Sequence, residues 1–397
     1  MVDRRVVRQV TDEERRARLA RRHRLSPAER TDDVVRITDD LIALHATDAS
    51  TVHLSAAARM VSPSTTAMER ALYDDRTLVR MLGMRRTMFV VTDELAPVVQ
   101  VSCTDAIAVV ERRKLVQQLE QGGVAKDGAR WLRKAERDTL AAVTERGEAT
   151  ASELSSMVPA LRAQLTFGEG KTWGGTQGVA TRVLSLLAAE GEIVRGRPRG
   201  SWSSSQYRWS PMSAWLPAGA HEVDAATAES ELVRRYLAAF GPATAADIRW
   251  WTGWTAGKMT RALGRLDVTD VEIDGGPAHV LSGDEREVSP TEAWAAALPS
   301  LDPTAMGWAG RDWYVGAHRA ALFDRSGNIG PTLWWDGRIV GVWAQRRDGE
   351  IVHRLLESVG RKAERAVALE LSRVRALVGS ARVTPRFRTP VERQLVD

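Results

Sequence analysis

The chain has 397 residues, of which 44% are apolar and 27% charged, without a low-complexity tract. This length exceeds what a single core usually serves, so about two to four compact units are expected. No apolar run has the length of a membrane span, and the arginine-rich start lacks the apolar centre of a signal peptide. A cytoplasmic protein is therefore expected.

The chain carries 56 lysine and arginine residues against 51 acidic ones, a net charge of +5. This modest excess suits a polyanionic partner. The single cysteine, Cys103, excludes an intramolecular disulfide and a cysteine-based zinc cluster, and is expected to be a small buried side chain. The sequence contains neither a Walker-type glycine loop nor a zinc-spaced His/Glu pair, so neither a metal nor an organic cofactor is predicted.

Arginines crowd the beginning of the chain, where nine lie between Arg4 and Arg24. They suit phosphate contacts and an ordinary solvated helix face equally well. Further along, Ser26–Glu29 has the pattern of a helix-capping box, and a second helix is predicted from Thr38 to Leu44.

The segment from Arg80 to Val91 ends in the strand-like run 88–91. Arg85 and Arg86 directly precede this run, and a helix-to-strand turn is predicted there. A turn of this kind exposes backbone and arginine donors, so a phosphate contact is expected at this pair.

An internal repeat is the most informative feature of the chain. Residues 147–154, Gly-Glu-Ala-Thr-Ala-Ser-Glu-Leu, return at 241–248 as Gly-Pro-Ala-Thr-Ala-Ala-Asp-Ile, and each copy follows an apolar-periodic helix. Thr150 and Thr244 are each placed to cap the helix that follows. This pattern is typical of the second helix of a helix-turn-helix, so the same unit is predicted twice.

The segments around each copy predict a winged helix. The first copy is followed by a helix over 176–190, a strand from 193, a turn at 197–201 and a returning strand at 206–209. The second copy lies among predicted helices over 231–240, 245–251 and 255–266, and a hairpin closes it between 268 and 281.

The last part of the chain changes from helical to β-rich. Asp336-Gly337 and Asp348-Gly349 are hairpin turns between apolar segments, which predicts an antiparallel meander, and a final amphipathic helix is expected over 362–377. The tryptophans of this part are predicted to form the core of its sheet rather than platforms for stacked bases. They are Trp334, Trp335 and Trp343.

The predicted fold class is α+β, mainly α, with tandem winged-helix units followed by an antiparallel β-rich domain and a terminal helix. Four domains are expected: a winged-helix-like helical domain over 1–125, winged helices over 126–217 and 224–285, and the β-rich domain over 286–397.

Several segments together resemble the AlkZ/YcaQ-type bacterial DNA glycosylases. They are His45-Ala46-Thr47-Asp48, residues 78–87, 176–217 and 241–254, Leu301-Asp302-Pro303, and residues 331–343. The resemblance covers most of the chain and rests on the order and spacing of the motifs. It implies tandem winged helices that enclose a DNA channel, and excision of bulky alkylated purines, interstrand crosslinks included.

The catalytic signature of that family is glutamine, an apolar residue, then glutamine or aspartate, usually followed by aspartate. His45, Thr47 and Asp48 match its frame, but both catalytic positions differ. Under the resemblance, Thr47 positions a water molecule, His45 acts as base or hydrogen-bond donor, and Asp48 supplies charge. The structural alternative is that His45 closes a helix while Asp48 caps the next one. Arg85-Arg86-Thr87 stands where the family has Arg-Gly-Thr, which suggests a divergent subgroup.

Two classes of function follow from these observations. The leading hypothesis is a monofunctional DNA glycosylase that acts as a monomer on double-stranded DNA in the nucleoid and needs no cofactor. The alternative is a catalytically inactive winged-helix DNA-binding protein or a dimeric transcription regulator. Binding is expected to be mostly electrostatic. The candidate DNA-binding residues are Arg85, Arg86, Arg197, Arg199, Lys258 and Arg261.

Overall fold

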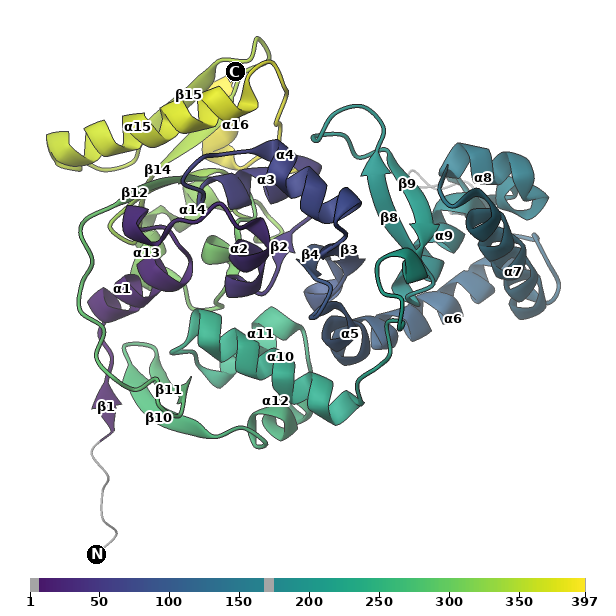
Figure 1. The fold of residues 1–397 in the computed structure, drawn as a ribbon, viewed down its shortest axis with the longest axis horizontal. Coiled ribbons are helices and arrows are strands. Elements are labelled where there is room, and N and C mark those ends of the chain that lie inside the picture. Colours follow the sequence, from purple (N-terminus) through teal and green to yellow (C-terminus); the bar gives the residue numbers. More distant parts are fainter. Residues whose placement is uncertain (1–6, 168–174, 397) are drawn as a thin grey trace, which may run out of the picture.

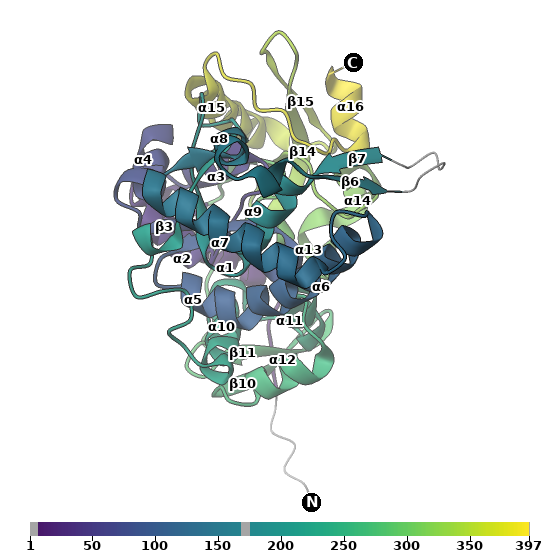
Figure 2. The same cartoon turned by 90° about the vertical axis from the view of Figure 1, so that its right-hand side faces the viewer.

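The computed structural model describes residues 7–167 and 175–396. Figure 1 shows four parts: a first part in the middle, a second to its right, a third below, and a C-terminal sheet with a long helix above. In the view of Figure 2, the helices α6 (Asp105–Gln121) and α7 (Gly128–Arg146) lie across the front of the second part.

Three of these parts repeat one order of elements: a helix, a short strand, two helices and a hairpin whose second strand pairs with the short strand. In the first part these are α2 (Val34–Asp40), β2 (Leu44–His45), α3 (Ala49–Ala57), α4 (Thr65–Glu69), β3 (Leu78–Leu82) and β4 (Met88–Thr92), and the sheet order is β2-β4-β3. The second part has α7, β5 (Ala149–Thr150), α8 (Ala151–Met157), α9 (Val179–Ala189), β8 (Ile193–Pro198) and β9 (Tyr207–Pro211), in the order β5-β9-β8.

The third part follows the same order with a shorter first strand. It contains α10 (Ala225–Phe240), α11 (Ala245–Thr252), α12 (Ala256–Leu263), β10 (Val268–Ile273) and β11 (Gly276–Leu281). A single bridge between Ala243 and His279 replaces the short strand. The α+β fold is confirmed, and this order of elements is the one predicted for a winged helix.

Both capping threonines of the repeat act as predicted. The hydroxyl of Thr150 accepts the N–H of Glu153, and that of Thr244 accepts the N–H of Asp247, while each acidic side chain accepts the N–H of its threonine. Such reciprocal bonds satisfy amides that have no partner within the helix. The repeat therefore begins α8 and α11 in the same way.

The helix predicted from Thr38 to Leu44 is wrong. Asp33 caps α2, which begins at Val34 and ends at Asp40, and the short strand β2 follows. Ile42 has φ of 65°, in the left-handed region that branched residues avoid, so the helix cannot continue through it. The apolar spacing that suggested a helix is produced by a buried helix end and a buried strand.

Two further predictions for the first part are also wrong. The capping box at Ser26–Glu29 is only a 3₁₀ turn over Pro27–Glu29, and the Ser26 side chain makes no capping bond. The helix-to-strand turn at Arg85 and Arg86 is the turn of the β3–β4 hairpin. Both arginines have positive φ values, and their side chains line different cavities.

The helix predicted over 176–190 begins later, at Val179. Residues Gly175–Gly178 form strand β7, which pairs with β6 (Gln164–Phe167) in a hairpin inserted between α8 and α9. The hairpin was missed because a short polar strand before an amphipathic helix carries no apolar alternation of its own.

The C-terminal meander is confirmed. Its sheet has the order β12-β13-β14-β15, formed by β12 (Ala295–Leu298), β13 (Thr332–Trp335), β14 (Arg338–Gln345) and β15 (Ile351–Leu355). The final helix α15 (Gly360–Val378) packs on β12, and α16 (Pro390–Val396) packs on β14. Trp334 is 0% and Trp343 2% exposed, so these tryptophans form core as predicted, and Trp335 is half-buried.

The buried apolar residues form one large cluster and a separate cluster in the second part. The large cluster joins the first part, the third part and the C-terminal sheet and also includes Val194 of β8 and Trp215, whereas the separate cluster fills the rest of the second part between Leu115 and Trp209. The predicted domain boundaries remain a prediction.

Most arginines of α1 (Asp12–Arg22) bind within the protein. Arg18 is 2% exposed and pairs with Glu14 and Asp284, Arg22 pairs with the same Asp284, and Arg15 lies 4.1 Å over the Trp313 ring. These contacts dock α1 onto the third and C-terminal parts rather than exposing it to a polyanion. Arg4 and Arg5 lie outside the described residues.

Candidate functional site

A cavity of about 500 Å³, here called the His45 pocket, lies where the first, third and C-terminal parts meet. Its walls come from four separate stretches of chain. They are His45, Arg85, Thr87, Trp250, Met306, Arg311, Arg319, Phe323 and the loop 324–328.

His45 sits in strand β2, opposite Phe89 of β4, with the two ring centres 5.0 Å apart. It is 4% exposed, and its Nδ1 has no hydrogen-bond partner among the described residues. Burial, together with the nearby Arg85 guanidinium, lowers the pKa of His45 to about 3, so the imidazole is neutral at physiological pH. The structural alternative, in which His45 closes a helix, is wrong, because His45 lies in strand β2.

Thr47 and Asp48 are half-buried beside His45 in the chain, but neither lines the His45 pocket. Asp48 stands at the N-cap position of α3 without accepting a helix amide, because its carboxylate instead accepts the backbone N–H of Arg386 at 3.2 Å. Burial raises the pKa of Asp48. The structure thus turns Asp48 toward the C-terminal segment.

Arg85 and Arg311 lie on the ring of Trp250 inside the His45 pocket. The guanidinium carbons are 4.1 Å and 4.3 Å from the ring centre. Gly253 makes this approach possible: it ends α11 with φ of 75°, and a Cβ there would lie 3.2 Å from the Arg85 backbone. Burial and the like charge of Arg311 lower the pKa of Arg85 to about 10, which keeps it cationic near neutral pH.

Arg86 points elsewhere. Its side chain is 48% exposed and pairs with Glu111 of α6. It lines a separate groove of about 360 Å³ beside α9, which also includes Lys114, Gln177 and Thr181. The two neighbouring arginines of the hairpin turn therefore serve different surfaces.

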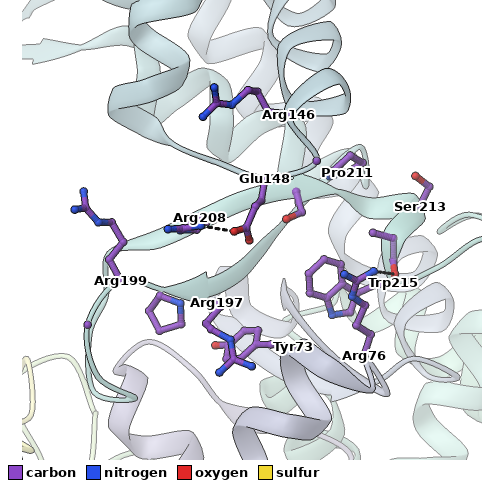
Figure 3. A pocket seen from close by; sticks show the side chains of 15 residues that line it. Tyr73, Arg76, Arg146, Glu148, Arg197, Arg199, Arg208, Pro211, Ser213 and Trp215 are labelled. Carbon is purple, nitrogen blue, oxygen red and sulfur yellow. Dashed lines mark hydrogen bonds and ion pairs between the residues drawn. The ribbon is translucent and has the colours of Figure 1, made fainter.

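A larger arginine-lined cavity lies between the first and second parts. This basic pocket has a volume of about 820 Å³, and Figure 3 shows it between the hairpin of the second part and the helical segment that carries Tyr73. Five arginines and one glutamate line it: Arg76, Arg146, Arg197, Arg199, Arg208 and Glu148.

Intramolecular contacts occupy several of these arginines. Arg197 pairs with Asp74 at 2.7 Å and lies over the ring of Tyr73, and Arg208 pairs with Glu148 (Figure 3). Arg199 instead extends from the rim in Figure 3, and it forms no ion pair with another described residue. Of the two predicted wing arginines, Arg199 is thus the better placed to meet a ligand.

The β8–β9 hairpin packs against the first part: the ring of Trp202, in its loop, lies 5.2 Å from the ring of His53, centre to centre. On α12, the Lys258 ammonium bonds the Ser102 carbonyl at 2.7 Å and pairs with Glu229 at 3.0 Å. Lys258 is therefore engaged within the protein. Arg261 of the same helix is exposed and lines neither arginine-rich cavity.

Sequence reasoning missed the residues that complete the His45 pocket. Trp250 belongs to the helix predicted over 245–251, Arg311 and Arg319 lie where no element was predicted, and Arg325 lies in a turn between short elements. A long-range cluster of this kind leaves no periodic signal in the chain. The sequence signals these residue types only through its overall content of arginine and tryptophan, and composition does not identify positions.

Repeated units with helix pairs, wings and arginine-lined cavities are an architecture used for nucleic-acid recognition. A family model described as "DNA glycosylase AlkZ-like" matches residues 38–377. The chain therefore belongs to the AlkZ-like DNA glycosylase family.

A curated sequence and a solved structure, both from Streptomyces sahachiroi, are similar to this chain. An interstrand DNA cross-link repair glycosylase is 28% identical over 220 residues, which span 52% of this chain and 57% of that protein. The match thus covers less than two thirds of that relative. The solved structure of DNA glycosylase AlkZ superposes with a TM-score of 0.71 at 21% identity, covering 95% of this chain and 99% of that one. This likeness supports the fold.

Within the described ranges, no helix combines the length and apolarity needed to cross a membrane.

Proposed function

We propose that this protein hydrolyses the N-glycosidic bond of bulky alkylated purines in double-stranded DNA, interstrand crosslinks included. Membership of the glycosylase family supports the class of reaction. The observation that carries the proposal is His45: a buried, neutral imidazole with an unpartnered Nδ1 lines a cavity at the position of the family's catalytic signature.

In the proposed reaction, a water oxygen bonds to the anomeric carbon of the deoxyribose while the cationic N7-alkylated base leaves as a neutral purine with the electron pair of the glycosidic bond, and the proton that the water loses passes to the solvent. Alkylation at N7 already makes the purine a good leaving group, so the protein needs chiefly to position water and stabilise the sugar's positive charge. Neutral His45 accepts a hydrogen bond from this water or donates one to it, according to its tautomer. Thr47 assists the positioning, and Asp48 contributes negative charge from outside the cavity.

DNA binding is proposed to use the basic pocket together with the His45 pocket. Arg199 and Arg146 suit phosphate contacts in the former, with Arg197 and Arg208 held by their carboxylate partners. Arg86 and Arg261 extend the contacts from other surfaces. The proposed active form is a monomer, and association with the nucleoid follows from affinity for DNA.

The test is base release from a duplex that contains one N7-alkylguanine, scored as abasic sites. The wild-type protein should release the base, whereas His45→Ala should bind the duplex equally well and release none. Phe387→Ala, at an exposed side chain, is a control that should retain full activity. Absence of release by the wild-type protein across several alkyl adducts, with normal DNA binding, would contradict the proposal.

A catalytically silent DNA-binding protein is the second candidate function. It is favoured by the departure of His45 and Thr47 from the family signature and by the turn of Asp48 toward Arg386. It predicts DNA affinity without base release. A transcription regulator would in addition bind one palindromic operator far more tightly than other sequences. An affinity that does not depend on the DNA sequence would exclude a transcription regulator.

A further inference from the structure

The His45 pocket holds more positive than negative charge, because four arginines line it against one lining carboxylate and the nearby Asp247, which acts on Arg311. Arg85, Arg311 and Arg325 form no ion pair with a carboxylate among the described residues, and Arg319 reaches Asp312 only at 3.8 Å. The single acidic residue of the lining, Asp324, accepts the N–H groups of its own loop. Four guanidinium groups therefore surround one cavity.

Two buried polar atoms of this lining have no partner: Nδ1 of His45 and Nε of Arg85. A buried polar group without a hydrogen bond destabilises the folded protein, so such atoms usually mark a site that a ligand or water completes. Arg85 Nε is a donor beside a cluster of like charges, which indicates that the group completing it is an anionic acceptor, whereas Nδ1 of neutral His45 remains available to the water of the proposed reaction.

The cluster is held in place before any ligand arrives. Arg311 is 4% exposed, and its Nε donates to the Trp308 carbonyl at 2.7 Å while the guanidinium lies on Trp250. Arg319 and Arg325, by contrast, are exposed at the edge of the cavity. A buried inner pair and an exposed outer pair of planar donor groups suit a tetrahedral oxyanion, because guanidinium groups donate parallel hydrogen bonds to phosphate oxygens.

We propose that the His45 pocket is a phosphate-binding subsite, which receives a backbone phosphate of the DNA strand that carries the modified nucleotide. Arg85 and Arg311 form its inner wall, and Arg319 and Arg325 close over the phosphate from the edge. The identity of the phosphate as DNA backbone rests on the proposed function, whereas the affinity for phosphate rests on the pocket alone.

The phosphate also has an electrostatic consequence for the proposed reaction. Uncompensated guanidinium groups near His45 would oppose the positive charge that develops on the sugar. A phosphate placed among them offsets this charge, so binding of the intact strand makes the site more favourable to the transition state. DNA whose backbone is neutral at this position should therefore be a poorer substrate.

The first experiment measures phosphate binding without DNA. Inorganic phosphate should raise the melting temperature of the wild-type protein by about one to two degrees over chloride of equal ionic strength. The Arg319→Gln/Arg325→Gln variant should lose most of this rise; both residues are exposed, so the fold is retained. The matched control, Arg361→Gln/Arg365→Gln on α15, should respond like the wild type. Equal responses of all three proteins would overturn the proposal.

The second experiment locates the phosphate in DNA. A series of duplexes contains a stable abasic-site analogue and one uncharged methylphosphonate at successive positions. The wild-type protein should lose about tenfold in affinity at one position next to the analogue, because a charged hydrogen-bond pair is lost there. In the Arg319→Gln/Arg325→Gln variant, the same substitution should cost at most twofold.

Equal losses in the two proteins, or no sensitive position, would contradict the subsite. Because this assay needs no catalysis, its outcome is separable from that of the proposed function. A protein that shows the sensitive phosphate but releases no base retains the subsite and refutes only the glycosylase activity.

Discussion

Arg59 and Asp302 form a bidentate ion pair in which both side chains are 0% exposed. The two guanidinium–carboxylate bonds measure 2.9 Å and 2.7 Å. Arg59 follows α3 of the first part, and Asp302 begins the short 3₁₀ helix Pro303–Met306 of the C-terminal part. Arg59 also donates to the His23 carbonyl. The pair therefore fixes the first part against the segment that leads into the His45 pocket.

Asp302→Asn should destabilise the protein by about 3–5 kcal/mol, because it leaves the Arg59 charge buried without its partner. Burial alone would raise the pKa of Asp302, but Arg59 and the nearby donors hold it below its usual value. Urea unfolding at pH 7 measures the loss. Asp312→Asn, at a side chain that is 87% exposed, should change stability by less than about 0.5 kcal/mol. A similarly small effect of Asp302→Asn would mean that the pair contributes little to stability.

The contrast between Thr244 and Ile42 shows what the sequence can predict here. Thr244 begins a helix through bonds to a residue three positions away, and local chemistry of this kind is readable from the chain. Ile42 instead adopts a left-handed conformation because tertiary packing demands it, which no local pattern signals.

The candidate site divides in the same way. His45 was found because residues 45–48 match the frame of the family's catalytic signature, and its strand setting was not predicted. Trp250 and Arg311 reach it from other parts of the chain, so only the folded structure brings the three together. The ion pairs of Arg197 and Lys258 were equally inaccessible, because their partners are distant in sequence.

The protein should lose stability as the pH falls below about 6.5. Burial is the main cause that lowers the pKa of His23, His45 and His53 to about 3 each, from a usual value of 6.5. Between these values the unfolded chain binds protons that the folded protein does not, so acidification favours unfolding. At pH 5 each histidine contributes about 2 kcal/mol to this loss.

His53→Leu tests this pH dependence through its slope rather than through stability at one pH. Between pH 5 and 6.5, the variant should take up about one proton fewer on unfolding than the wild type. The measurement is the free energy of unfolding in urea at several pH values. An identical slope for His53→Leu and the wild type would show that His53 is protonated in the folded protein.

Glu392 should oppose the histidines over part of the same range. Burial raises its pKa to about 7, from a usual value of 4.5, and the nearby Asp48 adds to the increase. The folded protein holds the Glu392 proton more tightly than the unfolded chain does. The contribution of this proton to the free energy of unfolding is therefore complete below pH 4.5 and is lost as the pH rises through about 7.

Glu392→Gln should therefore be more stable than the wild type at pH 8, by about 2 kcal/mol, and nearly equal at pH 4.5. Urea unfolding at both pH values measures the difference. Glu364→Gln, on the exposed side of α15, is the matched control, and as a surface substitution it should change stability at pH 8 by less than about 0.5 kcal/mol. A gain of the same size at both pH values would point to packing rather than to ionisation.

Salt dependence of DNA binding should separate the two arginines of the wing. Arg199 forms no ion pair with another described residue, so Arg199→Gln should reduce the slope of log affinity against log salt by about 0.9 if it meets one phosphate. Arg197 is paired with Asp74, so Arg197→Gln should change the slope less. Fluorescence anisotropy with an unmodified duplex at several salt concentrations measures both. If neither variant alters the slope, the wing does not contact DNA phosphates.

The last prediction concerns the division of work between His45 and Thr47. His45→Ala should abolish base release without changing DNA affinity, because it removes the buried imidazole that faces the cavity. Thr47→Ala should leave measurable activity, since a half-buried neutral hydroxyl contributes one hydrogen bond that water can replace. Activity should also be nearly independent of His45 ionisation between pH 5 and 8, because its pKa lies near 3.

The converse experiment restores the family signature with His45→Gln and Thr47→Asp together. If this double variant releases N7-alkylguanine and the wild-type protein does not, the natural residues have lost this activity or serve another adduct. Both proteins must first show equal DNA affinity, so that release reports on chemistry rather than on binding. If neither protein nor any single variant releases a base, while all bind DNA normally, the glycosylase activity proposed for this chain is refuted. The role of His45 is then structural: it pairs β2 with β4 and packs against Phe89.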